Sequence, residues 1–241
     1  MFIRWRLKQL IKLIPQYLEL SKEIKPRFAL RIQDRYICLG DATPFTGFDR
    51  HYVFHTAWAA RVLAKINPIV HIDISSSLYF ISNVSAFIPI KFFDYRPANL
   101  GLTGLSTDSA DLCRLKFSDN SVESLSCMHV VEHIGLGRYG DAIDYDGDLK
   151  AVSELQRVLA YDGHLLFVVP VGGKSLIQFN AHRIYTPSQV VDMFPNLDLV
   201  EFSLIPELEE DGGLVTSPSA DLVKKQKYAC GCFLFTKKTT S

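Results

Sequence analysis

The sequence lacks the features that mark membrane-spanning, secreted or nucleic-acid-binding chains. Its 26 Lys and Arg balance its 26 Asp and Glu, so no net charge attracts a polyanionic partner. No apolar run approaches the roughly 18 residues that a membrane span needs, and the N-terminus does not resemble a signal peptide. The five cysteines are scattered and odd in number, unlike a disulfide framework. We therefore expect a cytoplasmic protein with no nucleic-acid partner.

The sequence also lacks a complete metal motif. Cys230 and Cys232 would place two thiols on one face of a strand, but no second Cys or His pair stands nearby to complete a zinc site. The run Asp144-Tyr145-Asp146-Gly147-Asp148 resembles the start of a calcium loop, yet Leu155 occupies the position of the closing Glu. We expect no metal, and we expect Asp148 to cap the helix that follows it.

The basic residues that are present gather at the N-terminus. Residues 1–35 hold nine Lys and Arg against three acidic residues. Residues 2–20 form an amphipathic helical pattern, in which Pro15 is expected to break or kink the helix. The helix is interpreted either as a peripheral membrane contact or as a lid packed on the domain. The apolar face of this pattern consists of Ile3, Leu7, Leu10, Ile14 and Leu18.

Apolar runs alternate with amphipathic helices through the rest of the chain. This alternation is typical of a parallel sheet with helices on both faces. The last two strands are separated by a polar loop, which suits a closing hairpin. We expect a helical extension over residues 1–35 and one α/β domain over 36–241. The expected strands are 69–74, 90–94, 122–131, 164–170, 197–204 and 228–238, and the expected helices are 51–66, 78–87 and 148–160.

Acidic residues follow three successive strands. Asp73 ends the first strand and Asp94 ends the second. The spacing between these two residues is close to the ~20-residue interval at which a carboxylate reaches ribose hydroxyls in dinucleotide folds. Asp111 follows a further strand, the third along the chain, which we expect between residues 94 and 111, and a carboxylate there can accept from an adenine amino group. The carboxyl ends of parallel strands are where ligands bind, so the sequence predicts a nucleotide-type cofactor site there.

Two longer stretches carry a family resemblance. DLCRLKFSDNSVESLSCMHVVEHIG and ELQRVLAYDGHLLFVVP resemble the class I S-adenosylmethionine-dependent methyltransferases of the small-molecule type, and the resemblance covers residues 66–205. GDATPFTGFDRHYVFHTAWAAR, EHIGLGRYGDAIDYDGD and FNAHRIYTP resemble a methyltransferase-like group from nematodes and bacteria that is defined as a domain of unknown function. The first resemblance implies a Rossmann-like, doubly wound, mostly parallel seven-stranded sheet with an antiparallel last strand.

The resemblance further implies S-adenosylmethionine as cofactor. Asp73 would lie by its methionine and ribose, Asp94 would bind the ribose hydroxyls, and His129 would face it from the fourth strand. Asp111 and Leu112 would frame the adenine.

The glycine-rich turn of that family is absent. The family's D-x-G-x-G-x-G aligns with residues 73–79, where Ser75, Ser77 and Tyr79 stand in place of its three glycines. A serine adopts positive φ only at a cost, although its hydroxyl can hydrogen-bond the cofactor.

Three further residues are expected around the substrate opening. His133 follows the fourth strand, and His182 and Arg183 follow the fifth. Either histidine could be the base that accepts a hydroxyl proton, because its ordinary pKa is about 6.5. A structural hydrogen-bonding role is the alternative for each.

The sequence leaves two functions open. One is O-methylation of a small molecule or glycan precursor. The other is a non-catalytic relative that acts as a binding or scaffold protein, which the serine-rich turn favours. A nicotinamide-dependent enzyme is disfavoured because G-x-G-x-x-G is missing.

Overall fold

The chain forms two compact units, Met1–Phe48 and Asp49–Ser241. The structure is a computed structural model that describes residues 2–238, with side chains from residue 10 onward. The second unit begins at Asp49, later than the domain start expected at residue 36. The first unit contains α1 (Phe2–Leu20) and the 3-10 helix η1 (Ile32–Asp34). Because α1 continues through Pro15, the helix is not broken there.

A membrane contact through residues 2–20 stays a prediction. Within the described part of the chain, no helix is long and apolar enough to cross a bilayer.

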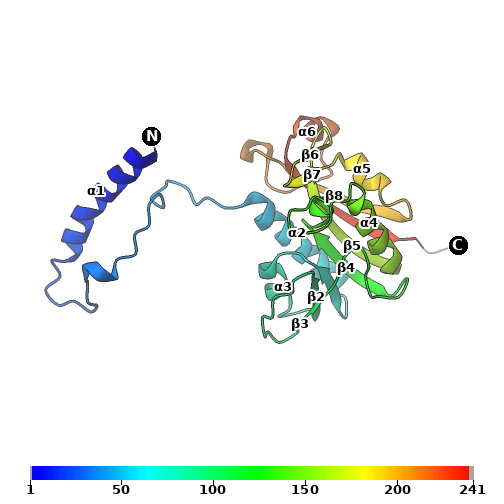
Figure 1. Ribbon diagram of the computed structural model, residues 1–241, viewed down its shortest axis with the longest axis horizontal. Coiled ribbons are helices and arrows are strands. Elements are labelled where there is room, and N and C mark those ends of the chain that lie inside the picture. The colour runs from blue at the N-terminus through cyan, green and yellow to red at the C-terminus, as the bar shows by residue number, and fades with distance from the viewer. Residues whose placement is uncertain (1, 239–241) are drawn as a thin grey trace. The chain divides into compact units, whose positions relative to one another are not determined.

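The second unit is built on an eight-stranded sheet with the order β3-β2-β1-β4-β5-β10-β8-β9 (Figure 1). A separate two-stranded sheet pairs β6 with β7. The strands are β1 (His71–Ile74), β2 (Ile90–Asp94), β3 (Leu105–Ser109), β4 (Val122–Met128), β5 (Leu159–Val171), β6 (Leu176–Gln178), β7 (His182–Ile184), β8 (Leu197–Ile205), β9 (Val215–Thr216) and β10 (Ala229–Lys237).

The strand directions confirm the predicted α/β class. The strands β3, β2, β1, β4 and β5 run parallel, and β10 lies antiparallel between β5 and β8. The two-residue strand β9 adds an edge beyond the seven strands expected. The chain reverses its direction of travel across the sheet between β1 and β4. This switch point brings the carboxyl ends of the first four strands to one opening.

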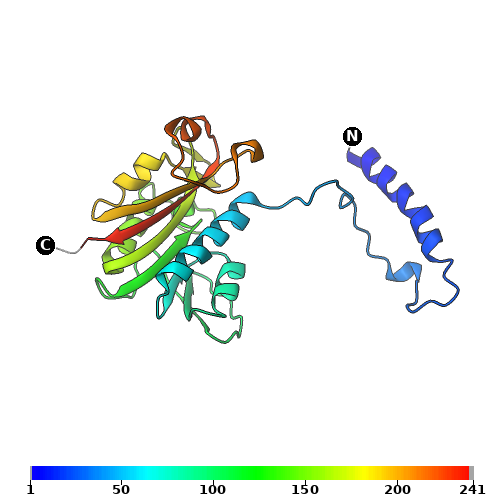
Figure 2. The ribbon, with the colours of Figure 1, turned by 180° about the vertical axis from the view of Figure 1, so that it is seen from behind.

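Helices cover both faces of the sheet. On one face, α2 (Arg50–Ile66) and α3 (Leu78–Val84) pack against a cluster that includes Trp58 and Phe80. Figure 2 shows α2 crossing this face. On the other face, α4 (Gly147–Val158) and α5 (Pro187–Asp192) cover the larger cluster. The remaining short helices are η2 (Val131–His133), η3 (Glu209–Asp211) and α6 (Ala220–Lys225).

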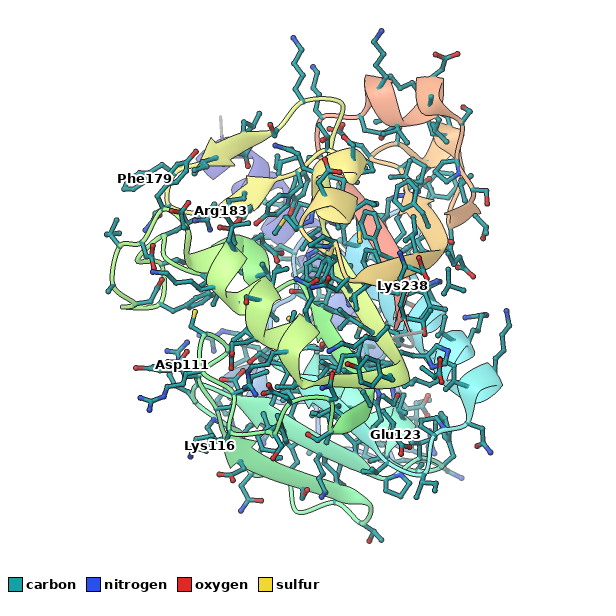
Figure 3. All side chains as sticks on the ribbon, turned by 90° about the vertical axis from the view of Figure 1, so that its right-hand side faces the viewer. Asp111, Lys116, Glu123, Phe179, Arg183 and Lys238 are labelled. Atoms are coloured by element: carbon teal, nitrogen blue, oxygen red, sulfur yellow. The ribbon has the colours of Figure 1, made fainter. Side chains whose placement is uncertain are left out.

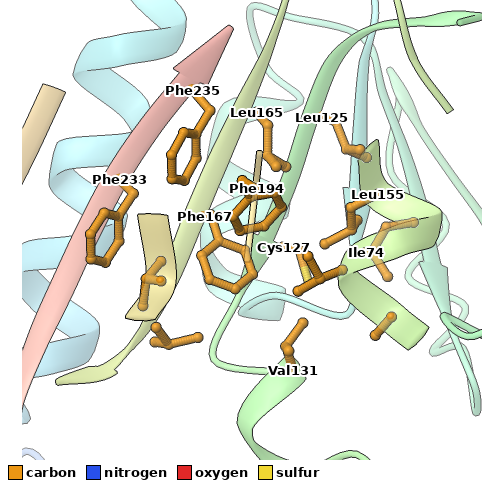
Figure 4. Packing of buried hydrophobic residues seen from close by; sticks show 14 of the residues in the cluster. Ile74, Leu125, Cys127, Val131, Leu155, Leu165, Phe167, Phe194, Phe233 and Phe235 are labelled. Atoms are coloured by element: carbon orange, nitrogen blue, oxygen red, sulfur yellow. The ribbon is translucent and has the colours of Figure 1, made fainter. Parts of the chain in front are cut away.

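Phenylalanine rings pack among aliphatic side chains in the larger cluster (Figure 4). The Phe194 ring lies with its centroid 4.9 Å from that of Phe167 on β5 and 4.7 Å from that of Phe235 on β10. All three side chains are buried. The continuous apolar runs of β5 and β10 are explained by this packing, because both strands are covered on both faces. Burying each ring contributes roughly 1.5–3 kcal/mol to the stability of the fold.

Candidate functional site

Asp73 lies beneath the turn that follows β1. Its fully buried carboxylate accepts from Ser126 Oγ on β4 and, at 3.0 Å, from the backbone N–H of Ser76. Burial raises the pKa of Asp73 to about 6. Asp73 is not among the residues that line the cavity described below, and the structure shows its carboxylate in contact with the turn.

Ser75 takes the backbone conformation that a glycine would take. Its φ is +56°, in the left-handed region, and its N–H donates to Phe93 O at 2.8 Å. Its hydroxyl donates to the same oxygen at 3.2 Å, which leaves the hydroxyl oxygen free to accept from a ligand. Ser77 instead begins α3 with φ −70° and makes no side-chain cap bond. The turn therefore keeps its bend without glycine.

A cavity of about 510 Å³ opens where the first four strands end. Asp94 accepts from the N–H of Arg96 at 2.7 Å, and Asp111 accepts from the N–H of Cys113 at 2.9 Å. These bonds orient the two carboxylates and leave acceptor capacity on each. The predicted site residues that line this cavity are Ser75, Asp94, Asp111, Leu112, His129 and His133.

His129 and Glu132 form a buried pair at the end of β4. His129 has φ +60°, and its Nδ1 lies 2.9 Å from Glu132 Oε1. Their side chains are 6% and 1% exposed. Burial lowers the pKa of His129 to about 4 and raises that of Glu132 to about 7. His129 is therefore neutral at pH 7 and donates through Nδ1, while Glu132 Oε2 has no hydrogen-bond partner among the described residues.

The two predicted base candidates are neighbours. His133 Nδ1 lies 2.6 Å from the carbonyl oxygen of Ala181, so it donates there and its Nε2 carries the lone pair. His182 stacks on Tyr228 with ring centroids 5.0 Å apart, and its Nε2 is buried without a partner in the described part. Desolvation lowers the pKa of both histidines, which keeps both imidazoles neutral. Of the two, His133 lines the cavity.

Arg183 does not line the cavity. Its guanidinium donates to the carbonyl oxygens of Ile134 at 2.7 Å and Tyr145 at 2.8 Å. Its Nε lies 3.5 Å from the carboxylate of Asp148. Arg183 is 5% exposed, and Figure 3 shows it on the same side of the domain as Asp111 in that view. These bonds hold Arg183 against the loop that follows β4.

Asp148 is not the helix cap that the sequence predicts. The cap position of α4 is Asp146, and Asp148 lies inside the first turn. Its carboxylate is buried and accepts from the hydroxyl of Tyr185 at 2.9 Å. The prediction failed because an acidic residue is favourable both at the cap position and in the first turn of a helix. The partner of Asp148 is Tyr185, which follows β7 and is far from Asp148 in the sequence.

The expectation that no histidine pair stands near Cys230 is wrong. Its Sγ lies 3.4 Å from His129 Nε2, and the His51 and His129 rings stack with centroids 5.7 Å apart and planes 9° from parallel. One ligand atom from each of His51, His129 and Cys230 lies within 4.8 Å of the others. We call these three residues, together with Glu132, the His–Cys cluster.

Several of these residues were missed from the sequence. His51 and His55 are four apart and share one face of α2, which is a spacing that places two imidazoles together. That signal was available, but His55 turns its Nδ1 to the carbonyl oxygen of His51 at 2.7 Å. Glu132 stands beside His133 in the sequence, yet only its burial shows that it belongs to the site.

The chain is similar to known methyltransferases in its fold and to a family of unknown function in its sequence. Residues 113–226 match the family described as "Caenorhabditis protein of unknown function, DUF268". No curated protein matches the sequence.

Solved structures match over most of the chain. The N-methyltransferase NodS from Bradyrhizobium japonicum, in complex with S-adenosyl-L-homocysteine, has a TM-score of 0.54 and 15% identity over 92% of this chain and 98% of that one. The Burkholderia thailandensis 1,6-didemethyltoxoflavin-N1-methyltransferase, with bound 1,6-didemethyltoxoflavin and S-adenosylhomocysteine, has a TM-score of 0.55 and 10% identity over 77% and 79%.

A third solved structure of similar fold is named as a cyclase and not as a methyltransferase. The [4+2]-cyclase SpnF has a TM-score of 0.52 and 12% identity over 76% of this chain and 82% of that one. Identities at this level show the fold alone, and one fold can carry several reactions. The resemblance to class I S-adenosylmethionine-dependent methyltransferases is therefore confirmed as a resemblance of fold.

Proposed function

We propose that this chain is an S-adenosylmethionine-dependent methyltransferase that methylates a hydroxyl group of a small molecule or glycan precursor. The observation that carries the proposal is the shared cavity, in which carboxylates from the ends of β2 and β3 meet the serine turn after β1. Its volume lies within the range of small-molecule sites.

The residues of the cavity fit this cofactor. Asp94 is oriented to accept from ribose hydroxyls, and Asp111 with Leu112 offers an acceptor and an apolar wall for the adenine. Ser75 presents a hydroxyl oxygen that can accept a hydrogen bond. The cofactor supplies an electrophilic methyl group on a sulfonium.

His133 supports the acid–base part of the proposal. Its Nδ1–H is held by the carbonyl oxygen of Ala181, so the free lone pair of Nε2 is available to a substrate hydroxyl. The hydroxyl proton would move to Nε2 as the oxygen forms its bond to the methyl carbon and the carbon–sulfur bond breaks. His182 and Arg183 are not in the cavity lining, and we assign them no contact with the substrate.

Calorimetric titration with S-adenosylmethionine and S-adenosylhomocysteine tests the proposal. We expect both to bind the wild-type protein, and we expect Asp94→Ala to weaken binding at least tenfold, because a charged hydrogen bond contributes roughly 1.5–3 kcal/mol. Asp221→Asn, an exposed carboxylate on α6, is the control and should bind normally. If the wild-type protein binds neither ligand at millimolar concentration, the alternative of a non-catalytic binding or scaffold protein stands instead.

A further inference from the structure

The His–Cys cluster joins residues from three separate parts of the chain. His51 comes from the first turn of α2, His129 from the end of β4, and Cys230 from the start of β10. Each presents an atom that binds transition metals, and these atoms lie within 4.8 Å of one another. The three residues thus converge from positions up to 179 residues apart in the sequence.

The distances suit one metal ion. In a tetrahedral zinc site, bonds of about 2.0–2.1 Å to nitrogen and about 2.3 Å to sulfur separate the two ligand atoms by about 3.6 Å. The observed separation of His129 Nε2 and Cys230 Sγ is 3.4 Å. The ligand atom of His51 lies within 4.8 Å of the other two, so a shift of its ring on the order of 1 Å would bring it to that spacing.

The contacts around His129 also match those of a metal ligand. Histidine ligands of metals usually donate their other ring N–H to a carboxylate, which fixes the ring orientation. His129 does this through Nδ1, which donates to Glu132 Oε1 at 2.9 Å and leaves the Nε2 lone pair facing Cys230. Glu132 is 1% exposed and its second oxygen has no hydrogen-bond partner in the described residues.

The charges of the cluster balance around a dication. No Lys or Arg in the described part forms an ion pair with Glu132, so a metal dication bound beside it would offset the charge of its carboxylate. A divalent ion, the carboxylate of Glu132 and a thiolate at Cys230 sum to zero. Two imidazoles and one thiolate are the donor set that zinc and its neighbours in the first row prefer over calcium or magnesium.

We propose that His51, His129 and Cys230 bind a zinc-like divalent transition-metal ion, with Glu132 as the carboxylate that orients His129. Binding releases the Cys230 thiol proton to solvent as the metal–sulfur bond forms. Three protein ligands leave a fourth position for water or a substrate oxygen. Since His129 also lines the cavity, the metal centre adjoins the site proposed for methyl transfer, although its existence does not depend on that function.

Cobalt(II) titration of the chelator-treated full chain tests the site, because cobalt reports a thiolate ligand by a sulfur-to-metal charge-transfer band. All proteins carry Cys38→Ser, which removes the exposed thiol. We expect one cobalt per chain with the band, and displacement of cobalt by zinc. Cys230→Ser should abolish the band and weaken binding at least about 100-fold, and Glu132→Gln should weaken it about 10–100-fold.

Cys232→Ala is the matched control, because Cys232 is an equally buried thiol two residues away on β10. It should keep the band. Absence of a band in the protein that carries Cys38→Ser alone, or a band that survives the further change Cys230→Ser, would overturn the proposal.

X-ray absorption of the zinc-loaded protein keeps the test decisive if Cys230→Ser does not fold. We expect one sulfur at about 2.3 Å and nitrogen or oxygen ligands at about 2.0–2.1 Å. A shell with no sulfur, or with several, would contradict the assignment. These measurements use no S-adenosylmethionine, so failure to bind that cofactor would leave their outcome unchanged.

Discussion

Ser126 on β4 donates its hydroxyl hydrogen to the carboxylate of Asp73 on β1, directly across the parallel pairing of the two strands. Since that hydroxyl is a donor to Asp73, it accepts from His71 Nε2 at 2.8 Å. His71 Nδ1 lies 2.7 Å from Ser124 Oγ, which completes a buried polar row across β1 and β4. The row satisfies two ionisable side chains inside an otherwise apolar sheet.

This row predicts two opposing pH dependences of folding stability. The folded-state pKa of Asp73 is raised by burial from 3.8 to about 6, so its contribution is full below pH 3.8 and is lost as the pH rises through 6. Burial lowers the pKa of His71 from 6.5 to about 3, so its contribution is full above pH 6.5 and is lost as the pH falls through 3. The two slopes largely cancel between about pH 4 and 6.

Asp73→Asn should therefore reveal the slope of His71. Relative to wild type, the free energy of unfolding of the variant should rise with pH by on the order of 1 kcal/mol per pH unit between about pH 4 and 6. Urea denaturation at several pH values measures this difference. Asp221→Asn should run parallel to the wild-type curve, and a parallel curve for Asp73→Asn would show that Asp73 is ionised in the folded protein.

The positive φ of Ser75 predicts that a glycine variant is more stable than an alanine variant at this position. At this position the left-handed backbone costs a residue with a Cβ roughly 1–2 kcal/mol. Both Ser75→Gly and Ser75→Ala lose the hydroxyl bond to Phe93, so the glycine variant should be about 1 kcal/mol more stable than the alanine variant. Chemical denaturation measures the difference.

Inside α3, the stabilities of the glycine and alanine variants should follow the opposite order. At Ser82, which lies in that helix, glycine should be less stable than alanine by about 1 kcal/mol. Equal stabilities of the two Ser75 variants would mean that the turn relaxes away from the left-handed conformation in solution.

Gly135 is required for the loop after β4 to close. A Cβ there would lie 2.0 Å from the carbonyl oxygen of Asp144, and the residue has φ +78°. Gly135→Ala must push the two loop ends apart, and we expect it to lower the free energy of unfolding by at least about 3 kcal/mol.

Gly140 in the same loop provides the control. Its φ is +85°, but a Cβ there would meet nothing within 4 Å. Gly140→Ala should cost only about 1–2 kcal/mol, the backbone part of the penalty. Thermal and urea denaturation compare the two variants, and equal losses would show that the contact with Asp144 does not constrain the loop.

Arg183 should stabilise the folded protein mainly through the hydrogen bonds that it donates to backbone carbonyl oxygens. Arg183→Ala leaves the carbonyl oxygens of Ile134 and Tyr145 without their donor, and we expect a loss of about 2–4 kcal/mol. Arg183→Lys should recover only part of this, since one ammonium cannot reproduce the planar guanidinium fork. The exposed Arg138→Ala should change stability by less than about 1 kcal/mol.

Limited proteolysis locates the effect of Arg183. Cleavage within residues 134–146 should increase in Arg183→Ala and not in Arg138→Ala. Unchanged cleavage there, together with unchanged stability, would refute the positioning role.

Some parts of the site were predictable because they depend on local patterns. Asp94 and Asp111 were placed correctly at strand ends, since apolar runs mark where a strand stops and parallel strands end at one edge. The bend at Ser75 was predictable for the same reason. Cys230 was not, because its partners are set by strand order and register, which sequence spacing does not encode.

The sequence by itself determined the alternation of buried strands and amphipathic helices, the parallel sheet and the three acidic strand ends, because hydrophobic periodicity is a property of short segments. Only the tertiary structure decided how the polar groups pair. In the tertiary structure Asp73 contacts Ser126, and Arg183 contacts Ile134 in the loop after β4. The tertiary structure also places His51 and Cys230 next to His129. Those pairings follow from which strands lie side by side and in which register, and they distinguish the lining of the cavity from the groups that support it.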